Sequence, residues 1–241
     1  MASPTDVLRK LTQQSNSNNL VGMAKFGMAV KNRLGVSMPN VRRIAREVGP
    51  DHTLALALWK TSIAEARIVA SIIADPDRMT PKQAEQWVKT FDSWDVCDQT
   101  CQNLFDKTPW AWRKVGTWAR RDEEFVKRAA FALLACLAWH DKRAADQRFI
   151  DLFPVLKNGS RDDRNFVKKA VNWALRNIGK RNRRLNQEAL KLAEEIRRLD
   201  SKAARWIAAD ATRELASRAI QLKLKKHRKG LALSGQVGYA P

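Results

Sequence analysis

Apolar residues recur at helical spacing along most of the chain, and one helical segment is repeated. Residues 124–130 (EFVKRAA) return as residues 165–171 (NFVKKAV), at an offset of 41 residues. Related helices are expected to begin near Ile63 and near Asp92. No segment shows the sustained period-2 alternation of a β-strand. A period of about 30–47 residues in a helical chain predicts an all-α, HEAT- or armadillo-like solenoid, in which neighbouring helix pairs bury one another's apolar faces.

Local signals mark several helix ends. Pro39 opens one segment and Gly49-Pro50 closes it. Asp51 is a plausible N-cap for the next helix, and Thr80-Pro81 starts another because proline fits the first helical turn. Ten glycines and eight prolines are few for 241 residues. This scarcity disfavours a β-sandwich or barrel, which needs many tight turns.

The charge balance predicts a polyanionic partner. Forty-five Lys and Arg face 25 Asp and Glu, for a net charge of +20. Residues 1–160 hold 24 basic and 17 acidic residues, a net +7, and residues 161–241 hold 21 and 8, a net +13. Such a field attracts nucleic acid, and repeat arrays usually bind on their concave face. We therefore expect a concave basic groove that binds DNA; the alternative is a generally basic protein with a solvated surface.

Composition also suggests boundaries and a compartment. We expect one repeat domain over residues 1–217 and a mobile basic tail over residues 218–241, since residues 221–229 hold five Lys or Arg. The first residues lack the apolar core of a signal peptide, and no stretch approaches the roughly 20 apolar residues that cross a bilayer. Three cysteines cannot all pair, which fits a reducing compartment. The predicted protein is a cytoplasmic monomer, nucleoid-associated if bacterial, with no membrane contact.

Tryptophan is unusually frequent, with nine residues against a single tyrosine. Most are expected to pack in the core. Trp173 differs because Lys169 and Arg176 flank it at helical spacings, and a Trp beside cations can stack on a sugar or base while the cations hold phosphates. Trp94 and Asp98 lie four residues apart, so a helix would place an indole and a carboxylate on one face. The competing interpretation of Asp98 is a structural salt bridge.

The cysteines allow a metal hypothesis that we do not favour. Cys97 and Cys101 are spaced i, i+4, as are Cys136 and His140, and four such ligands could bind zinc. Free cysteine is more often a small buried hydrophobe, and this spacing differs from the CxxC of structural zinc sites. No P-loop, Rossmann fingerprint or HExxH is present. We therefore predict neither a metal nor a cofactor.

The chain resembles the AlkD-type DNA alkylation repair proteins, a HEAT-like-repeat class of DNA glycosylase. Several motifs that carry the resemblance occur in the family's order, and together they span about residues 20–216. They are residues 23–45, 65–76, 87–109 (which include FDSWDVCD), 125–138 and 165–182.

The resemblance implies a monofunctional enzyme that excises positively charged N3- and N7-alkylated purines from double-stranded DNA, without a metal or a covalent lysine intermediate. Trp94, Asp98 and Trp173 fall on the family's catalytic cleft residues. Phe26 falls on a DNA-binding position where at least one relative has tyrosine. The candidates for DNA phosphates are Arg128, Lys168, Lys169, Arg176, Lys180, Arg181, Arg183 and Arg184. Some relatives bind DNA without catalysis, so the alternative function is a non-enzymatic module for structured DNA or RNA, or for a protein partner.

Overall fold

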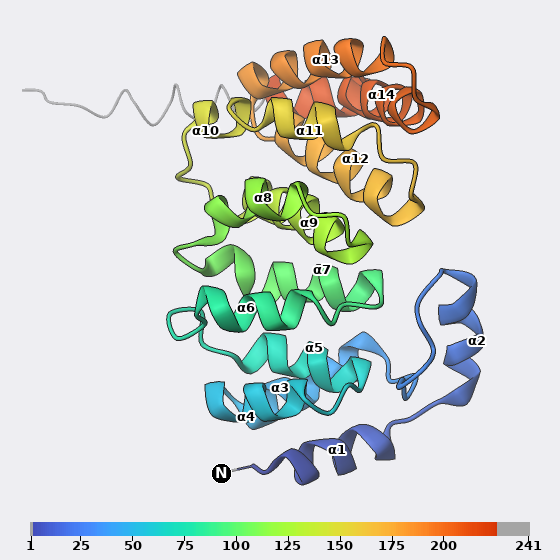
Figure 1. Cartoon of the computed structure of the whole chain (residues 1–241), viewed down its shortest axis with the longest axis vertical. Helices are drawn as coiled ribbons and strands as arrows, with labels where there is room; N and C mark the ends of the chain where they lie inside the picture. The colour runs from blue at the N-terminus through green and yellow to red at the C-terminus, as the bar shows by residue number, and fades with distance from the viewer. Residues whose placement is uncertain (1, 226–241) are drawn as a thin grey trace, which may run out of the picture. The chain divides into compact units, whose positions relative to one another are not determined.

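The structure is a computed structural model that describes residues 2–225, and every regular element in that range is helical (Figure 1). The chain divides into two compact units, residues up to Leu133 and residues from Leu134 onward. Helix α9 (Glu124–His140) begins in the first unit and ends in the second. The all-α prediction is confirmed.

The first unit is built on helices that lie against α5. Helix α5 packs against α3, α4 and α7, and α1 lies against α3 and α5. The elements before α9 are α1 (Pro4–Gln13), α2 (Ser17–Lys25), α3 (Met38–Val48), α4 (His52–Trp59), α5 (Ala64–Ile73), α6 (Pro81–Val88), α7 (Trp94–Asn103), the 3-10 turn η1 (Phe105–Lys107) and α8 (Ala111–Ala119).

The second unit is built on three long helices that pack on one another, α12, α13 and α14 (Figure 1). The shorter α10 and α11 lie against them. The elements are α10 (Asp146–Ile150), α11 (Phe153–Gly159), α12 (Asn165–Gly179), α13 (Arg183–Arg197) and α14 (Lys202–Leu215).

The helix ends agree with the local signals. The Asp51 side chain accepts a hydrogen bond from the Leu54 amide at the start of α4. Thr80 and Gln83 form a capping box at the start of α6, which satisfies two otherwise unpaired amides. The two copies of the repeated motif open α9 and α12, and α5 and α7 begin within two residues of Ile63 and Asp92. The helical repeat is therefore real and not a chance similarity of sequence.

Four of the nine tryptophans are core residues of the first unit. Trp59 and Trp87 stack with their ring centroids 3.8 Å apart and an interplanar angle of 4°. Trp110 and Trp118 contact the buried Phe105 at 5.4 and 5.6 Å. These rings join α4, α6, η1 and α8 into one aromatic core. The expectation that most tryptophans pack inside thus holds for this unit.

The chain remains ordered past the boundary expected after residue 217. Residues 218–225 are helical, Leu224 is buried, and the Gln221 side-chain amide donates to the Leu215 carbonyl and to Asn186. The prediction of a mobile tail is therefore wrong for residues 218–225, because Leu224 gives them an apolar anchor. The rest of the predicted tail, residues 226–241, lies outside the described residues.

Within residues 2–225, none of the helices has the length and apolar character to span a bilayer.

Candidate functional site

Helix α7 carries the Trp94–Asp98 pair near its start. Trp94 is the first residue of α7, and Asp98 follows one turn later on the same face. Both side chains are partly exposed. Val96, Cys97, Thr100 and Cys101 are buried on the other side of the helix and hold it against the core of the first unit. The predicted juxtaposition of an indole and a carboxylate is thus present.

Asp98 is held by a buried arginine from α9. Arg128 Nε donates to Asp98 Oδ1 at 3.0 Å, and Nη2 donates to Oδ2 at 2.7 Å. The side chains of Arg128 and Asp98 are only 7% and 14% exposed, and the guanidinium lies 6.0 Å from the centroid of the Trp94 ring. Trp94, Asp98 and Arg128 therefore form one cluster, which we call the Asp98 cluster. Arg128 therefore donates two hydrogen bonds to the Asp98 carboxylate. This differs from the sequence-based expectation that the charge of Arg128 is available to a DNA phosphate.

Burial decides the direction of the pKa shift of Asp98. Removal from water raises the pKa of the Asp98 carboxyl, and the adjacent Arg128 charge and hydrogen bonds oppose that rise. The Asp98 carboxylate in turn raises the pKa of Arg128, although burial acts in the opposite direction. The competing interpretation of Asp98 as an ion-paired residue is correct as far as geometry goes. An ion pair at a partly open position is compatible with a chemical role for the carboxylate.

The segment that carries Phe26 is fastened to the start of α7. Trp94 Nε1 donates to the Phe26 carbonyl at 3.0 Å, while the Phe26 side chain is 76% exposed. Arg33 donates to both oxygens of Asp95 at 2.8 and 2.9 Å, and Ser93 Oγ donates to Asp95 at 2.6 Å. The α2–α3 connection thus presents Phe26 beside Trp94. Arg33 and Asp95 are 62 residues apart, so no local sequence pattern predicts their pairing.

A second buried carboxylate shapes the same connection. Glu65 is 1% exposed and accepts hydrogen bonds from the backbone amides of Leu34, Gly35 and Val36 at 2.8–3.2 Å. Three converging amides satisfy a buried carboxylate that would otherwise be costly. Gly35 has φ +75°, a conformation that side chains rarely adopt. Its Asn16 neighbour comes so close that a Cβ would lie 2.1 Å from the carbonyl oxygen.

Trp173 lies on α12 in the second unit and is partly exposed. Its chain neighbour Asn172 donates to Asp210 at 2.6 Å, and Arg176 donates to Asp210 at 2.9 Å. Arg176 and Lys180 also pair with Glu214 on α14. The expected cationic face around Trp173 is therefore partly neutralised by acids on α14, which the spacing on one helix does not reveal.

The predicted phosphate ligands divide into engaged and available cations. Arg128, Arg176 and Lys180 are in ion pairs. Arg181 donates to the carbonyls of Ala138 and Ala144, and its guanidinium lies 4.4 Å from the centroid of the Phe149 ring, so it packs inside the second unit. Among residues 2–225 the remaining candidates have no ion-pair partner; they are Lys168, Lys169, Arg183 and Arg184, the last of which is bonded to the neutral Gln147.

One exposed aromatic of the second unit was not singled out from the sequence. Trp206 on α14 is 41% exposed, and the Lys168 ammonium lies 5.5 Å from its ring centroid. Lys202 and Asp210 lie four residues before and after Trp206. This spacing in the sequence indicates that Trp206 lies on a polar face of its helix.

The cysteines lie in the protein interior. Cys97, Cys101 and Cys136 are buried and unbridged. The Cys97 and Cys101 sulfurs lie 3.8 and 3.6 Å from the carbonyl oxygens of Phe125 and Ala129. Over the described part of the chain, no group of three or more His, Cys, Asp or Glu is arranged to hold a metal ion. The alternative zinc hypothesis finds no support in this geometry.

Comparisons with known proteins place this fold. One solved structure, described as a new family related to the HEAT-like repeat DNA glycosylases with affinity for branched DNA structures, superposes with a TM-score of 0.73 at 18% identity, over 88% of this chain and 95% of that chain. A designed armadillo repeat protein with a bound (KR)4 peptide aligns with a TM-score of 0.37 at 15% identity, over 96% and 92% of the two chains. No curated protein sequence matches the chain.

The first superposition shows a HEAT-like repeat fold, as predicted. At the level of sequence, the family model for the DNA alkylation repair enzyme matches residues 7–215, which include both copies of the repeated motif and the Asp98 cluster. The chain therefore belongs to the DNA alkylation repair enzyme family.

Proposed function

We propose that this protein is a monofunctional DNA glycosylase, which excises N3- or N7-alkylated purines from duplex DNA by hydrolysing the N-glycosidic bond. The observation that carries the proposal is the Asp98 cluster, in which a buried guanidinium holds a carboxylate beside a partly exposed indole. Family membership agrees with it.

The chemistry follows from the charge of the lesion. N3- or N7-alkylation makes the purine cationic and weakens its glycosidic bond, and departure of the base leaves positive charge on the sugar. A fixed carboxylate at Asp98 stabilises that charge without reorganisation during the reaction. Arg128 occupies one position on each Asp98 oxygen. A carboxylate accepts about four hydrogen bonds, so Asp98 retains capacity to orient the attacking water.

The aromatic residues add attraction for the cation. A positively charged group over an indole face gains about 0.5–2 kcal/mol, depending on how far it is desolvated. Trp94 is fixed for this role by its hydrogen bond to the Phe26 carbonyl. We assign Trp173 of the second unit a second aromatic contact with the lesion, on the strength of the family resemblance.

The test is single-turnover excision of 7-methylguanine from duplex DNA by the parent protein and by Asp98→Asn. Loss of a preorganised electrostatic group should lower the rate by about 10²-fold or more. Because the neutral amide of this variant would leave Arg128 buried without its anion, rates are normalised to the folded fraction. Trp94→Ala and Trp173→Ala should each lower excision as well. A folded Asp98→Asn protein that excises at the parent rate would contradict the assignment.

Glu85→Gln is the matched control. Glu85 is a half-buried carboxylate of the first unit that pairs with Lys114 and accepts from Trp118 Nε1 at 2.8 Å, outside the Asp98 cluster. Its substitution also breaks an ion pair, so it should lower stability while leaving the excision rate per folded molecule unchanged. If Asp98→Asn and Glu85→Gln lose excision equally, the loss in Asp98→Asn is due to a disturbed structure and not to a missing catalytic group.

The second candidate function is binding of branched DNA without excision. The exposed Trp206 beneath the Lys168 ammonium favours it, because an indole flanked by a cation suits an unstacked base near a phosphate. The structural neighbour described above has affinity for branched DNA. This candidate predicts tighter binding of a four-way junction than of a linear duplex, a preference that Trp206→Ala removes, and no release of 7-methylguanine by the parent protein.

A further inference from the structure

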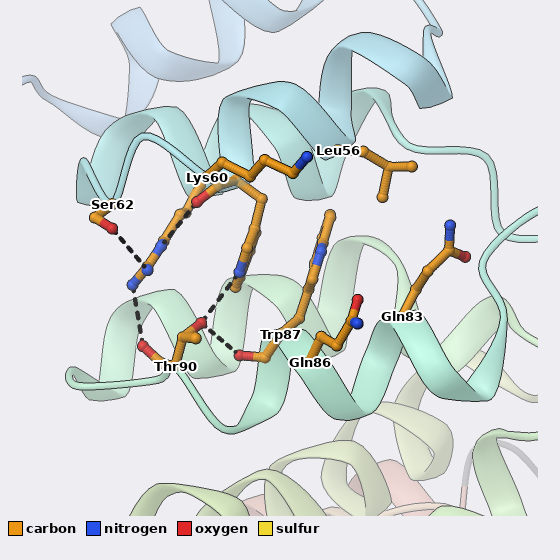
Figure 2. Close-up of a pocket in the computed structure, with 9 residues that line it drawn as sticks. Leu56, Lys60, Ser62, Gln83, Gln86, Trp87 and Thr90 are labelled. Atoms are coloured by element: carbon orange, nitrogen blue, oxygen red, sulfur yellow. Dashed lines mark hydrogen bonds between the residues drawn. The ribbon is translucent and has the colours of Figure 1, made fainter.

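A pocket of about 460 Å³ opens between α4 and α6 in the first unit (Figure 2). Its volume falls in the range of small-molecule sites, about 300–1,000 Å³. Trp59 and Leu56 of α4 and Trp87 and Gln83 of α6 line it, and Arg67 reaches it from α5. None of these residues belongs to the Asp98 cluster. The pocket is therefore separate from the site proposed for excision.

Arg67 is a buried cation whose partners are all neutral. The residue is 6% exposed, and its side chain donates to the Thr90 carbonyl at 3.0 Å and to the Trp59 carbonyl and Ser62 hydroxyl at 3.4 Å each. Among residues 2–225, no carboxylate forms an ion pair with it. Burial lowers the pKa of Arg67, and the charge of Asp92 acts against that change. A buried guanidinium with no anion in contact with it favours the binding of an anion, because its charge is otherwise unpaired.

The second charged residue of the lining is also a cation. Lys60 follows α4, is exposed, and has no ion-pair partner within the described range. The lining contains no acidic side chain. Gln83 and Gln86 add amide groups that donate and accept hydrogen bonds. The polar part of the pocket thus suits a ligand with negative charge and further hydrogen-bonding groups.

The rest of the lining is apolar and rigid. The Trp59 and Trp87 rings are stacked on each other, so a ligand meets a fixed surface and not a mobile side chain. Leu56 lies across the opening from Trp87 in Figure 2. A flat apolar group fits against these side chains, while an anionic group fits against Arg67 and Lys60.

We propose that this pocket binds the phosphate of a nucleoside monophosphate group, with the phosphate at Arg67 and Lys60 and the nucleoside beside Leu56 and Trp87. The bound group is either a free nucleotide or the 5′-phosphorylated end of a DNA strand. A guanidinium has five N–H groups, and three of those of Arg67 donate to the protein, so two remain to donate to phosphate oxygens. The site does not depend on the excision chemistry.

The experiment is calorimetric titration of the full chain with deoxyadenosine monophosphate, deoxyadenosine and inorganic phosphate. The nucleotide should bind with one site per chain, and removal of its phosphate should weaken binding by about tenfold or more, as expected for charge-assisted hydrogen bonds. Arg67→Gln should weaken nucleotide binding by a similar factor. Absence of binding at millimolar nucleotide, or equal binding of deoxyadenosine, overturns the proposal.

Two further variants keep the test valid if Arg67→Gln fails to fold. Lys60→Gln changes an exposed residue and should weaken nucleotide binding, and Leu56→Trp should block it by filling the pocket. Lys82→Gln is the control, because Lys82 is exposed on α6 but does not line the pocket. If Lys60→Gln and Leu56→Trp bind the nucleotide as Lys82→Gln does, the assigned pocket is wrong.

Short DNA strands with and without a 5′-phosphate separate the two sources. If strand ends are the ligand, the phosphorylated strand should bind more tightly, and Leu56→Trp should remove only that difference. If the ligand is a free nucleotide, the two strands should bind equally while deoxyadenosine monophosphate still binds. Because these probes contain no alkylated base, their outcome is independent of whether the protein excises alkylpurines.

Discussion

Asp95 and Asp98 are both partly buried, arginine-bound carboxylates of α7, but they differ in how many further hydrogen bonds each can accept. Asp95 receives two hydrogen bonds from Arg33 and a third from Ser93 Oγ. Asp98 receives its two from Arg128, and no other hydrogen bond to it is present among residues 2–225. Both carboxylates are held in place by hydrogen bonds, but Asp98 has more unused acceptor positions. This difference makes Asp98 the better candidate to bind water or a cationic sugar.

The raised pKa of Asp98 has a consequence for the pH dependence of excision. The proposed role requires the carboxylate, and burial favours the protonated acid, so activity should be lost as the pH falls through a value above the ordinary 3.8. Single-turnover rates measured across acidic pH on protein that remains folded should show this decline. Asp98→Asn should lack it, and a variant that keeps the same acidic decline would assign the titration to another group.

His52 at the start of α4 predicts a separate loss of stability in acid. It is 5% exposed, and neither ring nitrogen has a hydrogen-bond partner within the described chain. Burial lowers its pKa first, and the charge of Arg78 lowers it further. The fold therefore favours neutral His52. The stability that this provides is present above the unfolded pKa, about 6.5, and is lost as the pH falls below it.

Urea unfolding of the parent and His52→Leu proteins at about pH 7.5 and pH 5.5 measures this effect. The free energy of unfolding should fall more between the two pH values in the parent protein, since the variant has no imidazole to protonate. The carboxylates common to both proteins cancel in the comparison. An equal decrease in the two proteins would remove His52 as a cause.

At the scale of the element, the connection between α2 and α3 is irregular in shape but fixed by many bonds. Glu65 binds its backbone amides, Asp95 binds its Arg33, and Trp94 binds its Phe26 carbonyl. Gly35 permits the turn for two reasons: its φ of +75° is strained for other residues, and its close approach to Asn16 leaves no room for a Cβ. The connection therefore acts as a rigid support for the exposed Phe26.

Two glycine substitutions should have opposite effects on stability. Gly35→Ala forces a strained backbone conformation and a clash with a carbonyl oxygen, and should cost about 2–4 kcal/mol of unfolding free energy. Gly22→Ala places a methyl group in open space within α2, and should stabilise by about 0.5–1 kcal/mol because alanine favours helix. Denaturant unfolding measures both. Similar effects of the same sign would contradict the account of this connection.

The features that could be predicted from the sequence are local ones. The caps at Asp51 and Thr80 and the repeated start of α9 and α12 depend on residues a few positions apart, and they are confirmed. The pairing of Asp98 with Arg128 and of Asp95 with Arg33 joins residues 30 and 62 positions apart. Such partners depend on which helices pack together, and one sequence alone does not specify that. For the same reason the neutralisation of Arg176 by α14 was missed.

At the scale of the whole molecule, the net charge is +20, but not every cation that contributes to it is available to bind DNA. In the second unit, Lys180 and Arg176 share Glu214, whereas Lys169 and Arg183 are exposed with no ion pair among the described residues. A paired cation has already exchanged part of its hydration for a protein anion. Its charge is partly neutralised by that anion, so it contributes less to the attraction of a phosphate. The available cations should therefore dominate the electrostatic part of binding.

The salt dependence of DNA binding tests this division directly. A cation that neutralises a phosphate releases counterions, so its removal should reduce the slope of log affinity against log salt by about 0.9. We expect this change for Lys169→Gln and for Arg183→Gln, measured with undamaged duplex across a range of salt concentrations. Lys180→Gln is the matched control, because Glu214 remains paired with Arg176, and it should change the slope much less. If Lys180→Gln reduces the slope as much as Lys169→Gln does, the ion pairs seen in the second unit do not restrict which cations bind DNA.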